Sequence, residues 1–176
     1  MDLTLPRTDA MIRALPLLVA VAVLAGCPRD LTGPQLNLEG LPQGLDVQFA
    51  IEPGEVRQHE PFTASLTITN TTAEPIQVVT SHGCLVILHV TRNGQRVPFQ
   101  GSWMGCYAVV TTHTFAPGET RSETWNLRAE LYAQHPGDVE GAPAPKGTYL
   151  VQAEFDTGMA DGQFRKPLVE RTLQVK

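Results

Sequence analysis

The side chains of this 176-residue sequence that are most capable of chemistry are its three cysteines and five histidines. His82 and Cys84 stand two positions apart, and three more candidate ligands follow, namely Met104, Cys106 and His113. Thiolate, thioether and imidazole donors suit a soft ion such as Cu⁺. The sequence has neither a Cys-x-x-Cys nor a His-x-x-x-His spacing. We therefore expect no resident metal ion and no other cofactor.

Cys84 and Cys106 are also placed to pair with each other. They lie 22 residues apart and flank Asn93-Gly94, a dipeptide that is typical of a tight hairpin turn. Two such cysteines in an exported chain most simply form a disulfide. On the chain-entropy model, closing a loop of this length stabilises a fold by about 3 kcal/mol. The sequence thus favours a disulfide over a metal site.

Motifs that would indicate an enzyme are missing from the sequence. It contains no Gly-x-Ser-x-Gly nucleophile elbow, no His-Glu-x-x-His zinc motif and no glycine-rich phosphate loop. Its 18 acidic side chains outnumber 13 Lys and Arg, and the formal net charge is −5. A nucleic-acid surface needs clustered Lys and Arg. We therefore expect neither an enzyme nor a nucleic-acid-binding protein.

Residues 11–27 have the layout of a secretory signal peptide, with one basic residue, a short apolar core and small residues at the end. The ending Leu24-Ala25-Gly26-Cys27 resembles the lipobox of bacterial lipoproteins. That resemblance implies that the signal peptide, residues 1–26, is cut before Cys27 and that the Cys27 thiol carries diacylglycerol. We expect Met11 to be the true start, because the residues before it include two aspartates, which the leading part of a signal peptide normally lacks.

Residues 27–44 are rich in Pro and Gly and keep no period of 2 or 3.6, which predicts a tether between the lipid anchor and the domain. The folded domain then covers residues 45–176. Leu36, Leu38 and Leu41 leave an alternative open, in which this segment packs onto the domain as a first strand.

From residue 45 onward the hydrophobic pattern changes to a period of two. Residues 62–69 alternate strictly between apolar and polar side chains, which is typical of a half-buried strand. We expect further strands over residues 107–115 and 120–127, and a loop over residues 128–135. The 15 glycines and 14 prolines favour short strands joined by turns. The sequence thus predicts an all-β fold, an Ig-like β-sandwich of about eight to nine short antiparallel strands.

The loop just before Cys106 is a candidate contact site. It reads Gly101-Ser102-Trp103-Met104-Gly105, so that two large apolar side chains stand between glycines. An exposed apolar pair is typical of a contact with another protein. In the alternative interpretation, Trp103 covers the predicted disulfide.

Several segments resemble the intracellular proteinase inhibitor (BsuPI-like) domain. They are Phe62–Thr72 with the following Pro75-Ile76, Phe115–Thr120 with Trp125 downstream, and Pro145–Tyr149 ahead of the last strands. Their order and spacing match over residues 47–155. The resemblance implies an Ig-like β-sandwich and, through the name of the family, proteinase inhibition.

Together these interpretations predict an exported protein without catalytic activity. A lipid on Cys27 would anchor it to the cell membrane or the outer membrane, with the domain facing the periplasm or the exterior. We expect it to bind a protein partner at the cell envelope, either a protease or another envelope protein. Two alternatives are a copper-type metal-handling envelope protein that uses His82, Met104 and His113, and a purely structural envelope module.

The lipobox interpretation predicts that Cys27→Ser abolishes acylation, because the serine hydroxyl offers no thiol for the thioether bond. The variant should accumulate as an uncleaved precursor or a soluble form, and metabolic labelling with a fatty acid together with membrane fractionation would detect either. A Cys27→Ser protein that is processed and fractionates like the wild type would contradict the interpretation.

Overall fold

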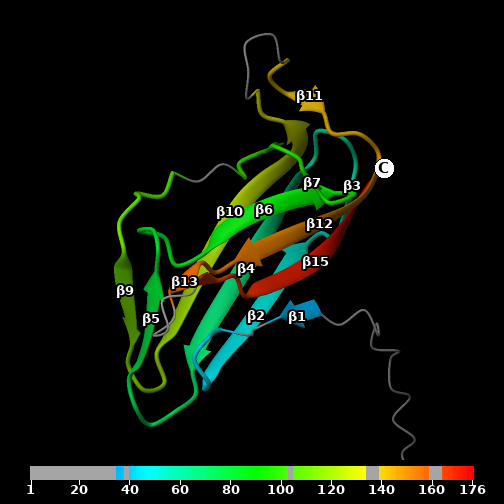
Figure 1. The fold of residues 1–176 in the computed structure, drawn as a ribbon. Coiled ribbons are helices and arrows are strands. Elements are labelled where there is room, and N and C mark those ends of the chain that lie inside the picture. The colour runs from blue at the N-terminus through cyan, green and yellow to red at the C-terminus, as the bar shows by residue number, and fades with distance from the viewer. Residues whose placement is uncertain (1–34, 38–39, 103–104, 134–138, 159–163) are drawn as a thin grey trace, which may run out of the picture. The chain divides into compact units, whose positions relative to one another are not determined.

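The computed structural model describes residues 35–37, 40–102, 105–133, 139–158 and 164–176, and every regular element in these ranges is a strand. The all-β fold class with antiparallel sheets is confirmed (Figure 1). Eight of the described strands have five or more residues, in agreement with the eight to nine predicted. Within the described ranges, no helix is long and apolar enough to cross a membrane.

The described strands form three sheets. The first sheet has the order β11 (Ala142–Pro143), β10 (Thr120–Leu131), β4 (Pro61–Asn70) and β2 (Leu45–Glu52), and β8 (Phe99–Gln100) also pairs with β10. The second sheet has the order β1 (Gln35–Asn37), β15 (Leu168–Val175), β12 (Gly147–Glu154), β6 (Ile87–Arg92) and β7 (Gln95–Arg96), and β3 (Glu55–Val56) runs parallel to β15. The third sheet has the order β14 (Phe164–Arg165), β13 (Thr157–Gly158), β5 (Ile76–Thr80) and β9 (Thr111–Phe115).

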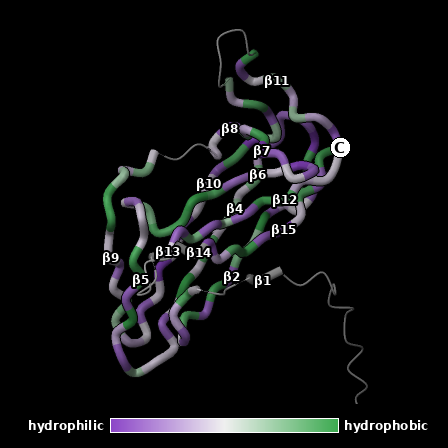
Figure 2. The backbone as a smooth tube through the Cα atoms, viewed as in Figure 1, coloured by the Kyte–Doolittle hydropathy of each residue, from purple (hydrophilic) through white to green (hydrophobic). Residues whose placement is uncertain are grey.

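An apolar core fills the space between the first two sheets. Every second side chain of β4 from Phe62 to Asn70 is buried, as the alternating sequence predicts, and the same alternation of hydropathy runs along the other long strands (Figure 2). The ring of Phe99 in the first sheet meets the ring of Tyr149 in the second, with 4.9 Å between the centroids. Two sheets that share one core in this way form a β-sandwich.

Strand β1 lies inside the segment 27–44 that the sequence predicts as a tether. Its three residues pair antiparallel with the start of β15, at Leu168–Glu170. They therefore belong to a sheet rather than to a tether, as the alternative interpretation expected, and they cover hydrogen-bonding groups that an edge strand would leave unpaired. The earlier part of the predicted tether, and the predicted signal peptide with Cys27, lie outside the described residues.

Two strand boundaries differ from the sequence prediction. The strand expected over residues 107–115 begins only at Thr111, because its partner β5 ends at Thr80, which pairs with Thr111. Strand β10 continues to Leu131, where the sequence predicts a loop from residue 128. It does so because Ala129 is buried in the core and Leu131 finds backbone partners in both β8 and β11.

Asn70, at the end of β4, is a fully buried polar residue that joins several segments. Its Nδ2 atom lies 2.8 Å from the Glu74 carbonyl oxygen and 3.1 Å from the carbonyl oxygens of Phe115 and Ala116. Its Oδ1 atom accepts hydrogen bonds from the backbone N–H and the hydroxyl of Thr72. A single amide thus holds the turn after β4 against the turn between β9 and β10.

We expect Asn70→Ala to lower the free energy of unfolding by about 3 kcal/mol, because it leaves several buried backbone groups without partners and each costs about 1–3 kcal/mol. Urea denaturation followed by circular dichroism measures the change. The matched control is Asn126→Ala on the exposed side of β10, for which we expect a change within about 0.5 kcal/mol. Equal stabilities of the two variants would contradict the role given to Asn70.

Candidate functional site

Cys84 and Cys106 form the disulfide that the sequence predicts, with 5.5 Å between their Cα atoms. Cys84 lies between β5 and β6, and Cys106 lies in the segment that leads into β9. Both residues are half-buried. The bond therefore joins two loops at the same end of the β5–β9 strand pair.

The segment that follows the disulfide is held by its backbone as well. The Gly83 N–H donates to the Tyr107 carbonyl oxygen at 2.8 Å, next to the disulfide itself. The Val109 N–H donates to the same oxygen, also at 2.8 Å. We call residues 105–110 the 105–110 loop. It is fixed at Cys106 by a covalent bond and at Tyr107 by hydrogen bonds.

The 105–110 loop presents large apolar side chains to solvent. Tyr107 is 83% exposed, Val109 55% and Val110 66%. Sequence reasoning missed these residues because it placed them in a strand, where alternate side chains would be buried. The available signal was the run Tyr-Ala-Val-Val, in which no polar residue alternates with the apolar ones. Trp103 and Met104, the contact pair chosen from the sequence, lie outside the described residues.

The turn that follows β8 depends on Gly101. Its φ of +86° is a conformation that favours glycine, and a Cβ atom there would come within 2.2 Å of the Asn126 carbonyl oxygen. The next residue, Ser102, donates from its backbone N–H and its hydroxyl to the Phe99 carbonyl oxygen. The chain thus leaves β8 in a tight turn against β10.

His82 lies beside the disulfide and is 9% exposed. One ring nitrogen of His82 and the two sulfur atoms lie within 4.8 Å of one another. Its Nε2 atom is 3.9 Å from Asp156 Oδ2, which is too long for a hydrogen bond, and that carboxylate accepts from the Ser81 hydroxyl at 2.6 Å. The structure therefore brings together three of the five candidate ligands.

The other two candidate ligands are Met104 and His113. Met104 lies outside the described residues. His113, on β9, has its Nε2 atom 3.3 Å from the Thr80 hydroxyl, which in turn donates to the His82 carbonyl oxygen. Burial lowers the pKa of His113, and the nearby Arg121 guanidinium lowers it further. His113 is thus a neighbour of the group, reached through Thr80.

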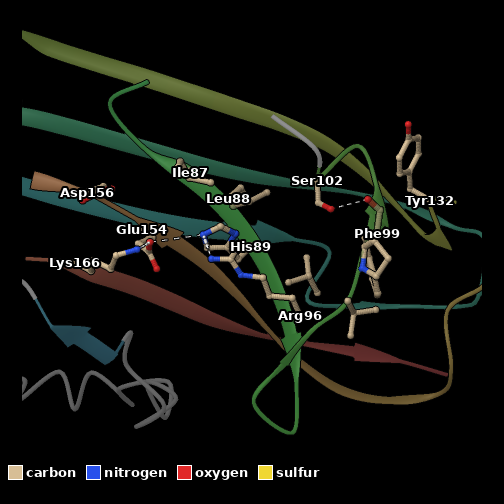
Figure 3. Close-up of a pocket in the computed structure, with 13 residues that line it drawn as sticks. Ile87, Leu88, His89, Arg96, Phe99, Ser102, Tyr132, Glu154, Asp156 and Lys166 are labelled. Carbon is tan, nitrogen blue, oxygen red and sulfur yellow. Dashed lines mark hydrogen bonds and ion pairs between the residues drawn. The ribbon is translucent and has the colours of Figure 1, made fainter. Parts of the chain in front are cut away.

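A separate cavity of about 440 Å³ lies beside β6 and β12. One end is charged, and the aromatic residues Phe99 and Tyr132 line the other (Figure 3). At the charged end, Lys166 Nζ is 2.9 Å from Glu154 Oε1, and Arg96 Nη2 is 3.0 Å from His89 Nε2.

Electrostatics at the charged end of the cavity follow from these pairings. Burial lowers the pKa of His89, the Arg96 guanidinium lowers it further, and the Glu154 carboxylate acts in the opposite direction. The Arg96 guanidinium donates a hydrogen bond to His89 Nε2. The hydrogen bond to Glu154 raises the pKa of Lys166. Ser102 directs its hydroxyl to a backbone carbonyl rather than to His89. The lining thus offers an amphipathic recess in which the charged side chains are already paired.

Comparison with known proteins identifies no family, since no family model and no curated protein matches the chain. Among solved structures, a β-glucosidase from Erythrobacter marinus is 14% identical with a TM-score of 0.43, over 75% of this chain and 15% of that one. An Escherichia coli alpha-2-macroglobulin structure, spanning domain MG7 to the C-terminus, is 15% identical with a TM-score of 0.45, over 76% and 17%. The CARDB domain of a Pyrococcus furiosus protein, in complex with di-metal ions, is 13% identical with a TM-score of 0.41, over 77% and 92%. The chain thus spans less than a fifth of the length of the first two.

The disulfide should make Cys84 and Cys106 inaccessible to alkylation in the folded protein until a reductant is added, which intact-mass measurement detects. We expect the double variant Cys84→Ser/Cys106→Ser to have a free energy of unfolding that is lower by about 3 kcal/mol, because the unfolded chain regains the entropy of an open loop. Cys27→Ser, which keeps the pair, is the control. Two thiols that are alkylated freely without reductant would contradict the bond.

Proposed function

We propose that the chain is a membrane-anchored, non-enzymatic protein-binding module of the cell envelope, and that it contacts its partner through the 105–110 loop. The observation that carries this proposal is the exposure of Tyr107, Val109 and Val110 on a segment held by the disulfide. Neighbouring exposed apolar side chains are typical of an interaction site. Tyrosine is also among the residues that dominate binding energy at interfaces.

The disulfide supports the proposal because ordering a flexible loop on binding costs affinity. Here the loop is already held by Cys106 and by the hydrogen bonds to the Tyr107 carbonyl oxygen. A partner then meets a surface whose shape changes little. Trp103 and Met104, the contact pair predicted from the sequence, stand immediately before this loop in the sequence.

The membrane anchor is proposed from the sequence Leu24-Ala25-Gly26-Cys27, which resembles a lipobox. A diacylglycerol carried by Cys27 would add about 0.8 kcal/mol of membrane affinity for each buried CH₂ group. Such an anchor would restrict the search for a partner to proteins at the same membrane.

A protease is the first partner to test, because the sequence resembles the BsuPI-like inhibitor domain. An inhibitor that occupies a protease cleft in the manner of a substrate needs an exposed loop of fixed shape. Among the described loops, the 105–110 loop combines exposure, a covalent restraint and an aromatic side chain.

The proposal is tested by passing an envelope extract over the immobilised full-length chain carrying Cys27→Ser, and then measuring the affinity of each captured protein for loop variants. We expect Tyr107→Ala to weaken binding at least about tenfold, which corresponds to about 1.4 kcal/mol. Val110→Ser and Val139→Ser are a matched pair, since these valines are 66% and 71% exposed but lie in different loops. Only the first should reduce binding.

An equal loss of affinity in the two valine variants, or no loss of affinity in Tyr107→Ala, would place the contact elsewhere.

The inhibitor proposal is tested separately with a panel of serine and metalloproteases. Inhibition at micromolar concentration that Tyr107→Ala removes would support it, whereas no inhibition across the panel would reject it. A chain that captures no protein at all would favour the purely structural alternative.

A further inference from the structure

His82 carries a buried imidazole that the described structure leaves without a hydrogen bond. The residue is 9% exposed, and neither Nδ1 nor Nε2 has a hydrogen-bond partner among the described residues. Leaving a buried polar group unsatisfied costs about 1–3 kcal/mol. Such a group in a folded protein calls for a specific explanation, and a role in binding an ion is one.

The sulfur atoms of two cysteines lie close to that imidazole. One ring nitrogen of His82 and the sulfur atoms of Cys84 and Cys106 lie within 4.8 Å of one another. In the disulfide the sulfur atoms are poor ligands, because the thiolate is the form that binds metal ions. Reduction would turn the same atoms into two thiols beside an imidazole, and these become thiolates when they bind an ion. Thiolate ligands select Cu⁺ and Zn²⁺, and a set of two cysteines and one histidine is an established zinc-binding set.

We propose that reduction of the Cys84–Cys106 disulfide creates a binding site for one thiophilic ion, Cu⁺ or Zn²⁺, whose ligands are Cys84, Cys106 and His82. The electrons come from a dithiol reductant, such as the reduced form of a thiol–disulfide oxidoreductase. Its two thiols become a disulfide while the Cys84–Cys106 bond becomes two thiols. Binding of the ion then releases the two thiol protons. This inference stands independently of the proposed protein contact.

The surroundings of the site are already organised around the three ligands. Cys84 and Tyr107 stay close through the hydrogen bond from Gly83 N–H to the Tyr107 carbonyl oxygen, which does not depend on the disulfide. The Asp156 carboxylate, which accepts a hydrogen bond from the Ser81 hydroxyl, lies 3.9 Å from His82 Nε2, beyond hydrogen-bond distance. Metal-binding histidines commonly donate their second ring N–H to a carboxylate. Both cysteines are half-buried, so an ion can reach them from solvent.

The test uses the full-length chain with Cys27→Ser, in which Cys84 and Cys106 are the remaining cysteines. The protein is reduced anaerobically with a phosphine, freed of reductant and titrated with Zn²⁺ or with Cu⁺ in competition with a chromophoric chelator. We expect one ion per reduced chain, and no binding by the oxidised chain at the same concentrations. We also expect His82→Gln to weaken binding at least about tenfold, since even the outer-shell partners of metal ligands change affinity 10–100-fold. The exposed His59 provides the control, and His59→Gln should bind like the wild type.

Three results would overturn the proposal: no ion bound by the reduced chain, equal affinity of the oxidised chain, or equal affinity of His82→Gln. X-ray absorption spectroscopy of the ion-bound protein identifies the ligands directly in a chain that keeps His82. A spectrum that lacks either the two sulfur ligands or the imidazole nitrogen would also reject the site. Circular dichroism follows the fold during reduction. If reduction unfolds the chain, refolding by one ion supports the site, and failure of the ion to refold it counts against the site.

Discussion

The buried amide of Asn70 constrains how one end of this sandwich is built, because its donors and acceptor have to be met inside the protein. They are met by the turn after β4 and by the turn between β9 and β10. Those turns flank the first residue pair of the third sheet, where Ile76 of β5 faces Phe115 of β9. The opposite end of the same strand pair is closed by the Cys84–Cys106 disulfide, just beyond Thr80 and Thr111. The β5–β9 strand pair of the third sheet is thus held at both ends.

This clamp explains why the candidate site lies at the disulfide end of β5 and β9. The strands stop pairing at Thr111, so the residues before it are free to form an exposed loop, yet the disulfide and the Gly83 N–H keep that loop in place. The proposed protein contact and the proposed ion site both depend on Cys84 and Cys106, and the two proposals are compatible. An ion with metal–sulfur distances of about 2.3 Å would keep the two sulfurs within about 4.6 Å of each other. The 105–110 loop would therefore stay restrained both in the oxidised chain and in the reduced chain with its ion bound.

Much of the fold follows from local patterns in the sequence. The strict alternation over residues 62–69 specifies which face of β4 is buried, and Trp125 is buried on β10 as its place in the pattern suggests. Strand ends are less local, because a strand continues as long as a neighbour offers hydrogen bonds and buried surface. Leu131 extends β10 since β8 and β11 pair with it, and those segments are distant in sequence or only two residues long. Strand β1 likewise forms because β15 offers it hydrogen bonds, although the segment that contains β1 has the composition of a tether.

For the candidate site, the sequence by itself determined the candidate ligands and the disulfide, because two cysteines that flank a predicted hairpin turn most simply pair with each other. It did not determine which histidine accompanies them. His82 joins Cys84 and Cys106 while His113 is reached only through Thr80, and this choice depends on how the loop after β5 packs against the segment before β9. The exposure of Tyr107, Val109 and Val110 was likewise decided by tertiary structure. Burial is a property of the whole fold, since an apolar side chain is covered only where another segment arrives to cover it.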